Sequence, residues 1–246
     1  MKIALPKGRL LPGVLDVFQK AGITFTFADE SRTTLFLQSI LRPVVVSLAR
    51  VLKKAGVTIG FASSRDYNPK CSDSFFSATL FKPRAIPQLI DLGLCDVGFC
   101  GLDIMKEAGY FDVVDVLNLG LNKVVVVVAV PKGQENFLAN PPKRPVVIAT
   151  EYPKTASKWA MAHNLAHINL FTGGSTEGYA PRFADLIVDC VETGDTMGAN
   201  HQHIVETLFE SATCMIVNRT VMEDYRMREA ILVLKHRLSE ALKVKE

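Results

Sequence analysis

The sequence has few of the features that mark secreted or disulfide-rich proteins. Its five cysteines are scattered along 246 residues, with no CxxC pair and no regular spacing. An odd number of isolated cysteines is typical of reduced thiols, so we expect a cytoplasmic protein without a disulfide framework. The N-terminus, MKIALPKGRL, reaches a proline and a charged turn after three apolar residues. We therefore expect no secretory signal peptide.

Long hydrophobic runs and strong charge are also missing. The most apolar run, VVVVVAV at 124–130, is far shorter than the about 20 residues that span a bilayer, so we expect a buried strand and no membrane association. The net charge is only +3, and no block of Lys and Arg occurs before the C-terminal tail. This balance favours local anion sites over a nucleic-acid partner.

Strand-like and helix-like segments alternate along the chain. The expected strands are 3–5, 75–81, 96–99, 113–117, 124–130, 146–149, 168–171, 186–191 and 214–217. The expected helices are 10–21, 44–55, 86–92, 102–108, 155–162, 198–208 and 222–242. This alternation predicts an α/β fold with mostly parallel strands.

The segment ADLIVDCVETGDTMGAN at 184–200 carries the strongest indication of function. Its apolar run predicts a buried strand, and ETGDT predicts a tight turn into a helix. Backbone N–H groups converge in such a turn and the helix start adds positive potential, which suits a phosphate. Gly194 permits close approach, Thr193 and Thr196 can donate hydrogen bonds, and Asp189 can accept them from ribose hydroxyls. An ordinary turn at a solvated strand end is the alternative.

Two further segments place polar groups after expected strands. In ALPKGRLL, Lys7 and Arg9 flank a glycine after the first strand, where α/β sheets bind ligands, so the two cations suit a pyrophosphate or triphosphate. A solvated basic turn is the alternative. In CDVGFCGLDIM, Gly101 permits close approach, and capping of the following helix is the favoured role of Asp103.

The polar turns IATEYPKTASKW at 148–159 and GGSTEGYAP at 173–181 complete this set. The first ends an expected strand and opens a helix, which makes it a candidate anion or nucleotide contact. The second is a glycine loop that precedes the phosphate turn and carries one carboxylate, Glu177. Together with the segments above, these turns predict a site for a phosphorylated ligand.

Taken in order, these segments resemble the catalytic chain of the ATP phosphoribosyltransferase family, and the turn in ADLIVDCVETGDTMGAN resembles the loop that binds phosphoribosyl pyrophosphate (PRPP). The resemblance runs from ALPKGRLL through FKPRAIPQLIDLGLCDVGFCGLDIM, VVIATEYPKTASKW and GSTEGYAP and covers most of the chain. It implies an α/β fold of two lobes like type II periplasmic binding proteins, with mostly parallel sheets and the active site in the interlobe cleft. The lobes are expected at 1–119 with 212–246 and at 120–211.

The resemblance also implies a reaction: transfer of the 5-phosphoribosyl group of PRPP to N1 of ATP with release of pyrophosphate, the first step of histidine biosynthesis. Mg²⁺ would bridge the substrate phosphates, without a dedicated protein metal site. The implied PRPP-binding residues are Asp185, Asp189, Glu192, Thr193, Gly194, Asp195, Thr196 and Met197. The residues implied for ATP or pyrophosphate are Lys7, Gly8, Arg9, Arg32, Gly101, Asp103 and Glu177. Lys7, Arg9 and Asp189 are the expected catalytic residues, because this displacement depends on positioning and electrostatic stabilisation.

Two departures from the family pattern favour another function. Ala85 and Leu102 stand where an aspartate and a basic residue are usual, which favours a catalytically impaired paralogue that acts as a cytosolic nucleotide- or PRPP-binding regulatory module. The lack of a C-terminal regulatory domain resembles the short form, which implies a homodimer able to join a regulatory subunit related to histidyl-tRNA synthetase. A zinc site at His163 and His167 is disfavoured, because no third ligand accompanies them.

Overall fold

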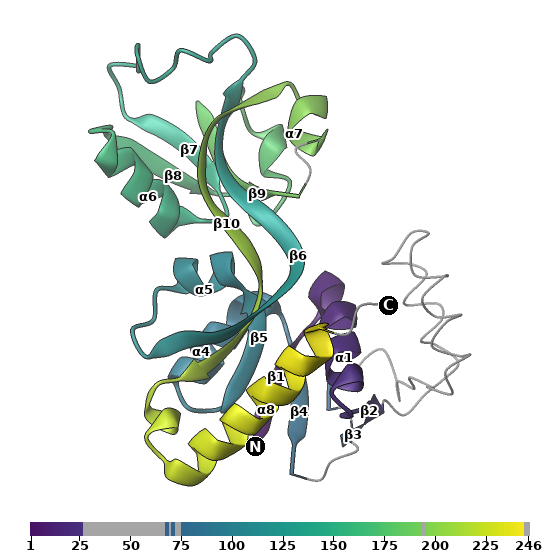
Figure 1. Cartoon of the computed structure of the whole chain (residues 1–246). Helices are drawn as coiled ribbons and strands as arrows, with labels where there is room; N and C mark the ends of the chain where they lie inside the picture. Colours follow the sequence, from purple (N-terminus) through teal and green to yellow (C-terminus); the bar gives the residue numbers. More distant parts are fainter. Residues whose placement is uncertain (27–66, 69, 72–74, 193–194, 244–246) are drawn as a thin grey trace. The chain divides into compact units, whose positions relative to one another are not determined.

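The computed structural model describes residues 1–26, 67–68, 70–71, 75–192 and 195–243 (Figure 1). The chain forms two compact units: unit 1 comprises Met1–Asn122 and Thr213–Glu246, and unit 2 comprises Lys123–Ala212. The expected boundaries after 119 and 211 therefore correspond to boundaries after 122 and 212 in the structure. The helix expected at 44–55 and the residue Arg32 lie outside the described residues.

Unit 1 contains a sheet with the strand order β4-β1-β5-β10. Its first three strands are parallel to one another, whereas β10 pairs with β5 in antiparallel register. These strands are β1 (Lys2–Pro6), β4 (Ser77–Phe81), β5 (Val97–Gly101) and β10 (Gln202–Asn218). A separate two-stranded sheet pairs β2 (Phe25–Thr26) with β3 (Lys70–Cys71).

Helices cover both faces of the unit 1 sheet. The shorter elements are η1 (Gly8–Leu10), η2 (Pro83–Ala85) and η4 (Thr220–Met222), and the longer ones are α1 (Leu11–Lys20), α4 (Ile86–Asp91), α5 (Leu102–Ala108) and α8 (Tyr225–Lys243). Residues of β1 alternate between the faces: Ile3 and Leu5 join a core with α1 and α8, and Ala4 joins a core with α4. Alternation with period two produces this division.

Unit 2 has the strand order β6-β9-β7-β8. β7 (Val146–Thr150) is parallel to β8 (His167–Phe171) and to β9 (Leu186–Val191), and β6 (Val113–Pro131) is antiparallel to β9. The helical elements are α6 (Pro153–Ala162), η3 (Thr176–Gly178) and α7 (Asp195–Ala199). Val188 faces a core that contains Trp159 of α6, and Ile187 faces a smaller one with Met197 of α7.

Three expected elements differ from the structure. The strands expected at 113–117 and 124–130 form one continuous strand, β6, which begins in unit 1 and ends in unit 2. The helix expected at 198–208 is a strand instead: α7 ends at Ala199, His201 has a left-handed φ of 56°, and β10 begins at Gln202. The β-branched residues Ile204 and Val205 favour the extended form.

The other expected strands and helices that lie within the described residues coincide with observed elements, apart from their ends. For example, α1 ends where expected, because Gly22 takes up the left-handed conformation with φ 74° that terminates many helices. None of the helices in the described parts of the chain is long and apolar enough to cross a membrane.

Candidate active site

The carboxyl ends of three parallel strands meet at one edge of unit 2. β7 lies between β8 and β9, so that Thr150 is paired with Phe171 on one side and with Val188 on the other. Ligands of open α/β sheets bind at this edge, where the loops leaving the strands bring polar groups together. In unit 2 these loops surround Asp189, near the end of β9.

Asp189 is the predicted catalytic residue at this edge. Its side chain is half-buried, and the residue lies opposite Val127 of β6. The N–H of Cys190 donates a hydrogen bond of 2.7 Å to its Oδ1 atom, and the Thr176 side chain also hydrogen-bonds the carboxylate. An ionised carboxylate has about four acceptor positions. Asp189 therefore retains the capacity to accept hydrogen bonds from a ligand.

The surroundings of Asp189 oppose its ionisation. Burial raises the pKa of this carboxyl above its ordinary value, and the negative charges of Glu151 and Glu177 raise the pKa further. The hydrogen bonds from Cys190 and Thr176 act in the opposite direction. A ligand that donates hydroxyl hydrogen bonds to Asp189 would stabilise its charged form, so the site favours such a ligand.

Three residues of this edge are not singled out by the sequence patterns: Glu151, Thr172 and Thr176. The Oε1 atom of Glu151 is 3.9 Å from the position that a Cβ atom on Gly174 would occupy, so its carboxylate reaches the glycine loop. The hydroxyl oxygens of Thr172 and Thr176 are 2.8 Å apart. IATEYP contains Glu151, GGST contains Thr176 and Thr172 directly precedes GGST, but only the strand order brings these segments to Asp189.

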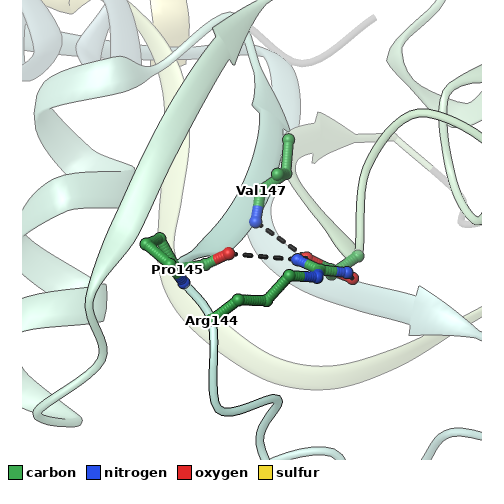
Figure 2. Close-up of polar contacts among 4 residues, drawn as sticks. Arg144, Pro145 and Val147 are labelled. Carbon is green, nitrogen blue, oxygen red and sulfur yellow. Dashed lines mark hydrogen bonds and ion pairs between the residues drawn. The ribbon is translucent and has the colours of Figure 1, made fainter.

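Asp185 does not lie at this edge. It precedes β9 at the opposite end from Asp189, and Arg144 binds it through two hydrogen bonds of 2.7 Å, one to each carboxylate oxygen. Figure 2 shows Arg144 between Pro145 and Val147, with dashed lines at the Pro145 carbonyl and the Val147 N–H. The N–H of Val147 donates a third bond of 2.8 Å. The Arg144 guanidinium lowers the pKa of Asp185 below its ordinary value, and the bond from Val147 adds to this effect. Asp185 therefore links the start of β7 to the start of β9. It lies away from Asp189.

The predicted phosphate turn connects β9 with α7. Glu192 is exposed at its start, and Met197 is almost fully buried in a small core with Ile187, where it anchors α7 to the sheet. Thr193 and Gly194 lie outside the described residues. Asp195 and Thr196 belong to α7, but their side chains also lie outside what the structure describes.

Unit 1 has its own group of cations at the carboxyl ends of its parallel strands. β1 and β4 are in register up to Pro6 and Phe81, and the N–H of Lys7 donates to the carbonyl of Phe81 at 2.8 Å. Lys7 and Lys82 thus follow neighbouring strands. Arg9 is exposed in η1. Gly8 makes the turn possible, because its φ of 74° is in the region that favours glycine.

Lys7 lies in a distinct local environment. Its Nζ atom is 3.2 Å from the centroid of the Tyr67 ring, close enough for a cation–π interaction. Desolvation lowers the pKa of Lys7 below its ordinary value, and the nearby charge of Lys82 lowers it further. Two cations and one exposed arginine at one strand edge favour a polyanionic ligand, which would relieve their mutual repulsion.

Gly101 and Asp103 form one local structure at the end of β5. Gly101 is the N-cap residue of α5, so Asp103 does not have the capping position that the sequence favours. Asp103 is buried in the first turn of the helix, with its carboxylate folded over Gly101 so that a Cβ atom at position 101 would collide with it. Gly101 therefore leaves room for the Asp103 carboxylate, and a larger residue at position 101 would displace it.

The residues predicted for ATP or pyrophosphate are divided between the units. Unit 1 holds Lys7, Gly8, Arg9, Gly101 and Asp103, and unit 2 holds Glu177. Glu177 lies in η3 and its charge acts on Asp189. Glu177 therefore belongs with the residues predicted for PRPP.

His163 and His167 have separate protein partners. The Nε2 atom of His163 is 3.5 Å from Glu206, and the Nε2 atom of His167 is 2.9 Å from the hydroxyl of Ser157. Within the described ranges, no group of three His, Cys, Asp or Glu residues is arranged to hold a metal ion.

Comparison with known proteins identifies the family. The model of the family "HisG: ATP phosphoribosyltransferase" matches residues 82–240, well over half of the chain. The chain belongs to this family. Its members catalyse the first step of histidine biosynthesis, and the match includes β9, η3 and the phosphate turn.

Curated relatives cover nearly the whole chain. ATP phosphoribosyltransferase from Thermoanaerobacter sp. is 32% identical over 242 residues, which are 96% of this chain and 94% of the relative. The enzyme from Wolinella succinogenes is 30% identical over 99% of this chain and 98% of the relative. The enzyme from Prosthecochloris aestuarii is 31% identical but longer, and 68% of it is covered. The chain therefore matches family members of about its own length as well as longer ones.

A solved structure confirms the fold class. The ATP phosphoribosyl transferase (HisG:HisZ) complex from Thermotoga maritima contains a chain with a TM-score of 0.74 and 22% identity, covering 99% of this chain and 98% of that one. The predicted α/β fold with mostly parallel strands is thereby confirmed for this family member.

Proposed function

We propose that this chain transfers the 5-phosphoribosyl group of PRPP to N1 of ATP, with release of pyrophosphate. Family membership supports the reaction class. The observation that carries the assignment of the site is the position of Asp189, half-buried beside two glutamates at the carboxyl ends of β7, β8 and β9 and directly before the phosphate turn. This position suits a carboxylate that accepts hydrogen bonds from ribose hydroxyls while the turn holds the 5′-phosphate.

The chemistry requires stabilisation of separated charge. The lone pair of N1 forms a bond to C1 of the ribose, the bond from C1 to the pyrophosphate oxygen breaks, and pyrophosphate leaves with that electron pair. Positive charge develops on the sugar, and the carboxylates of Asp189, Glu151 and Glu177 are of the sign that stabilises it. Lys7 and Arg9 provide the opposite charge for the pyrophosphate or the triphosphate.

Magnesium ion belongs to this proposal as a companion of the substrates. When bound, it neutralises phosphate charge, and we propose that it is held mainly through the phosphates, since Mg²⁺ retains waters and rarely occupies an all-protein cage. We also propose a cytoplasmic location, which the free cysteines of the described chain support.

We further propose a homodimer that joins a regulatory subunit related to histidyl-tRNA synthetase. The support is the likeness to a chain of the HisG:HisZ complex from Thermotoga maritima over almost the full length of both chains. An equivalent subunit would regulate turnover without contributing to the chemistry described above.

The proposed reaction is tested by mixing the protein with ATP, PRPP and Mg²⁺, with and without the regulatory subunit, and following product absorbance. Turnover is expected, and Asp189→Ala and Thr196→Ala should each weaken PRPP binding, with a loss of roughly 1.5–3 kcal/mol for the charged group. Wild-type PRPP affinity in both variants would contradict the assignment of the phosphate turn.

One observation favours a second function, that of a regulatory module without ATP chemistry. Leu102, at a position where a basic residue is usual, is partly buried against the core formed by β1, β5 and α4, and Ala85 is exposed in η2. Neither contributes a charge for ATP. The same assay separates the functions, because the module would bind PRPP and give no product with or without the subunit.

A further inference from the structure

Thr176 has an unusual position for a hydroxyl residue in a loop. It is completely buried, although it lies in η3 immediately after an exposed glycine loop. Ser175, directly before it, has a left-handed φ of 51°, and this sharp bend turns the chain inward at Thr176. A buried hydroxyl must find hydrogen-bond partners, because an unsatisfied one costs free energy. Thr176 finds two, Asp189 and Thr172.

The direction of these hydrogen bonds follows from the chemistry of the groups. Ionised Asp189 can only accept, so the single hydroxyl proton of Thr176 is donated to it. The contact of 2.8 Å between Thr172 and Thr176 must then be donated by Thr172. Thr172 is fixed in turn by its N–H, which donates to the carbonyl of Thr150 at 3.2 Å. A chain of oriented groups thus runs from the end of β7 to Asp189.

We propose that Thr176 is a positioning residue of the PRPP site, whose buried hydroxyl holds the Asp189 carboxylate in the orientation that accepts the ribose hydroxyls. This proposal rests on the proposed function. With the Cys190 N–H bonded to Oδ1, the bond from Thr176 adds a second constraint on the carboxylate. Thr172 supports Thr176 from the far side, and neither threonine needs to touch the substrate.

The electrostatic setting gives the hydroxyl a measurable effect. The charged groups acting on Asp189 are Glu151, which follows β7, and Glu177 in η3, and both disfavour its ionisation. On β6 the residue opposite is Val127, which is apolar. Thr176 and the backbone N–H of Cys190 are the groups that act against these charges and against burial. Removing the hydroxyl should therefore raise the pKa of Asp189 and weaken PRPP binding together.

The experiment compares Thr176→Val, which removes the hydroxyl at nearly constant volume, with Thr176→Ser, which keeps it. Thr207→Val, at an exposed position of β10, is the matched control for the substitution. The pKa of Asp189 is read without substrate, from the carbon-13 shift of its carboxyl group. PRPP affinity is measured by calorimetry between pH 5 and 8.

Thr176→Val should raise the pKa of Asp189 and weaken PRPP binding by about tenfold, the effect of one hydrogen bond to a charged group. As the pH is lowered, Thr176→Val should begin to lose PRPP binding at a higher pH than the wild type does. Thr176→Ser and Thr207→Val should stay within about threefold of the wild type, since a hydrogen bond is retained or untouched. Thr172→Val should also raise the pKa of Asp189 and weaken PRPP binding, but by less than Thr176→Val. This variant tests the proposal even if Thr176→Val does not fold.

The two readouts separate the possible failures. An unchanged pKa of Asp189 in both Thr176→Val and Thr172→Val would overturn the positioning role, whatever the substrate is. If the wild type binds no PRPP while the pKa shifts as expected, the proposed function fails and the hydrogen-bond chain stands. If Asp189→Asn loses PRPP while Thr176→Val keeps wild-type affinity and pH dependence, the proposed function stands and the positioning role is wrong.

Discussion

Asp185, directly before β9, and Asp189, within β9, are four residues apart and have opposite electrostatic environments. Arg144 and the Val147 N–H hold Asp185 in its charged form and lower its pKa. Burial and two neighbouring glutamates raise the pKa of Asp189. A charged group that is satisfied stabilises the fold, whereas one that is opposed by its surroundings costs stability and is available to a ligand. The two carboxylates are therefore distinguished by their partners: protein donors hold Asp185, whereas Asp189 keeps acceptor capacity for the proposed ligand.

Asp189→Asn should stabilise the protein while weakening PRPP binding. A carboxyl group whose pKa is raised by folding leaves the free energy of unfolding unchanged below its unfolded pKa of about 3.9. It lowers the free energy of unfolding as the pH rises from there through the folded pKa. The variant should therefore gain on the order of 1 kcal/mol at pH 7, or about 2–4 °C in Tm, and the gain should disappear near pH 4. Thermal unfolding at the two pH values is the measurement. A variant that is less stable than the wild type at pH 7 would contradict the electrostatic account of Asp189.

Asp185→Ala should destabilise unit 2 by about 1–3 kcal/mol, because it leaves the Val147 N–H without its acceptor. Arg144→Ala should cost less than Asp185→Ala, since the Arg144 side chain is 59% exposed and its charge is screened by water. The lowered pKa of Asp185 gives stability that is present above about pH 3.9 and is lost as pH falls through the folded value. Urea unfolding at pH 7 and pH 3 tests this order. PRPP affinity near the wild-type value in folded Asp185→Ala would show that Asp185 does not hold the ribose.

Arg9→Ala should reduce turnover more than it reduces PRPP affinity. The exposed guanidinium of Arg9 is proposed to stabilise charge on the leaving pyrophosphate, and loss of one such donor costs roughly 2.7–4 kcal/mol in comparable sites. The matched control is Arg228→Ala, an exposed arginine of α8 in the same unit, which should leave kcat unchanged. Steady-state kinetics with saturating ATP and PRPP would refute the role of Arg9 if the two variants had equal rates.

The isolated chain should be a homodimer of low activity, and addition of the regulatory subunit should raise kcat. This expectation follows from the assembly proposed above. Light scattering gives the oligomeric state, and the absorbance assay gives the rate with increasing amounts of the subunit. A strictly monomeric chain that is fully active alone would be incompatible with this assembly.

Local patterns predict much of the fold, because they report properties of neighbouring residues. The run from Leu186 to Val191 and the stop of α1 at Gly22 follow from apolar periodicity and glycine conformation, and the structure has both. The helix expected at 198–208 failed because its apolar spacing is compatible with a helix, whereas β-branched residues and the backbone at His201 favour a strand.

The candidate site is less predictable, since its contacts join residues that are far apart in the sequence. Alternation along an extended chain places Asp189 of β9 and Asp185, directly before β9, on the same face, but a rise of about 3.3 Å per residue separates them by roughly 13 Å. The association of Asp189 with Glu151 and Thr176 depends on the strand order β9-β7-β8, which no local motif encodes. The Arg144–Asp185 pair, 41 residues apart, has the same origin.

During synthesis on the ribosome, unit 2 is complete before unit 1 can be. All of unit 2 lies between the two segments of unit 1, and the larger unit 1 core needs Met215 from β10 and Leu234 from α8. Phe18 and Phe99 of that core therefore emerge from the ribosome long before the helix that completes it. Unit 2 can therefore fold while unit 1 still exposes apolar surface. Exposed apolar surface of this kind makes a nascent chain prone to misfolding and a substrate for chaperones.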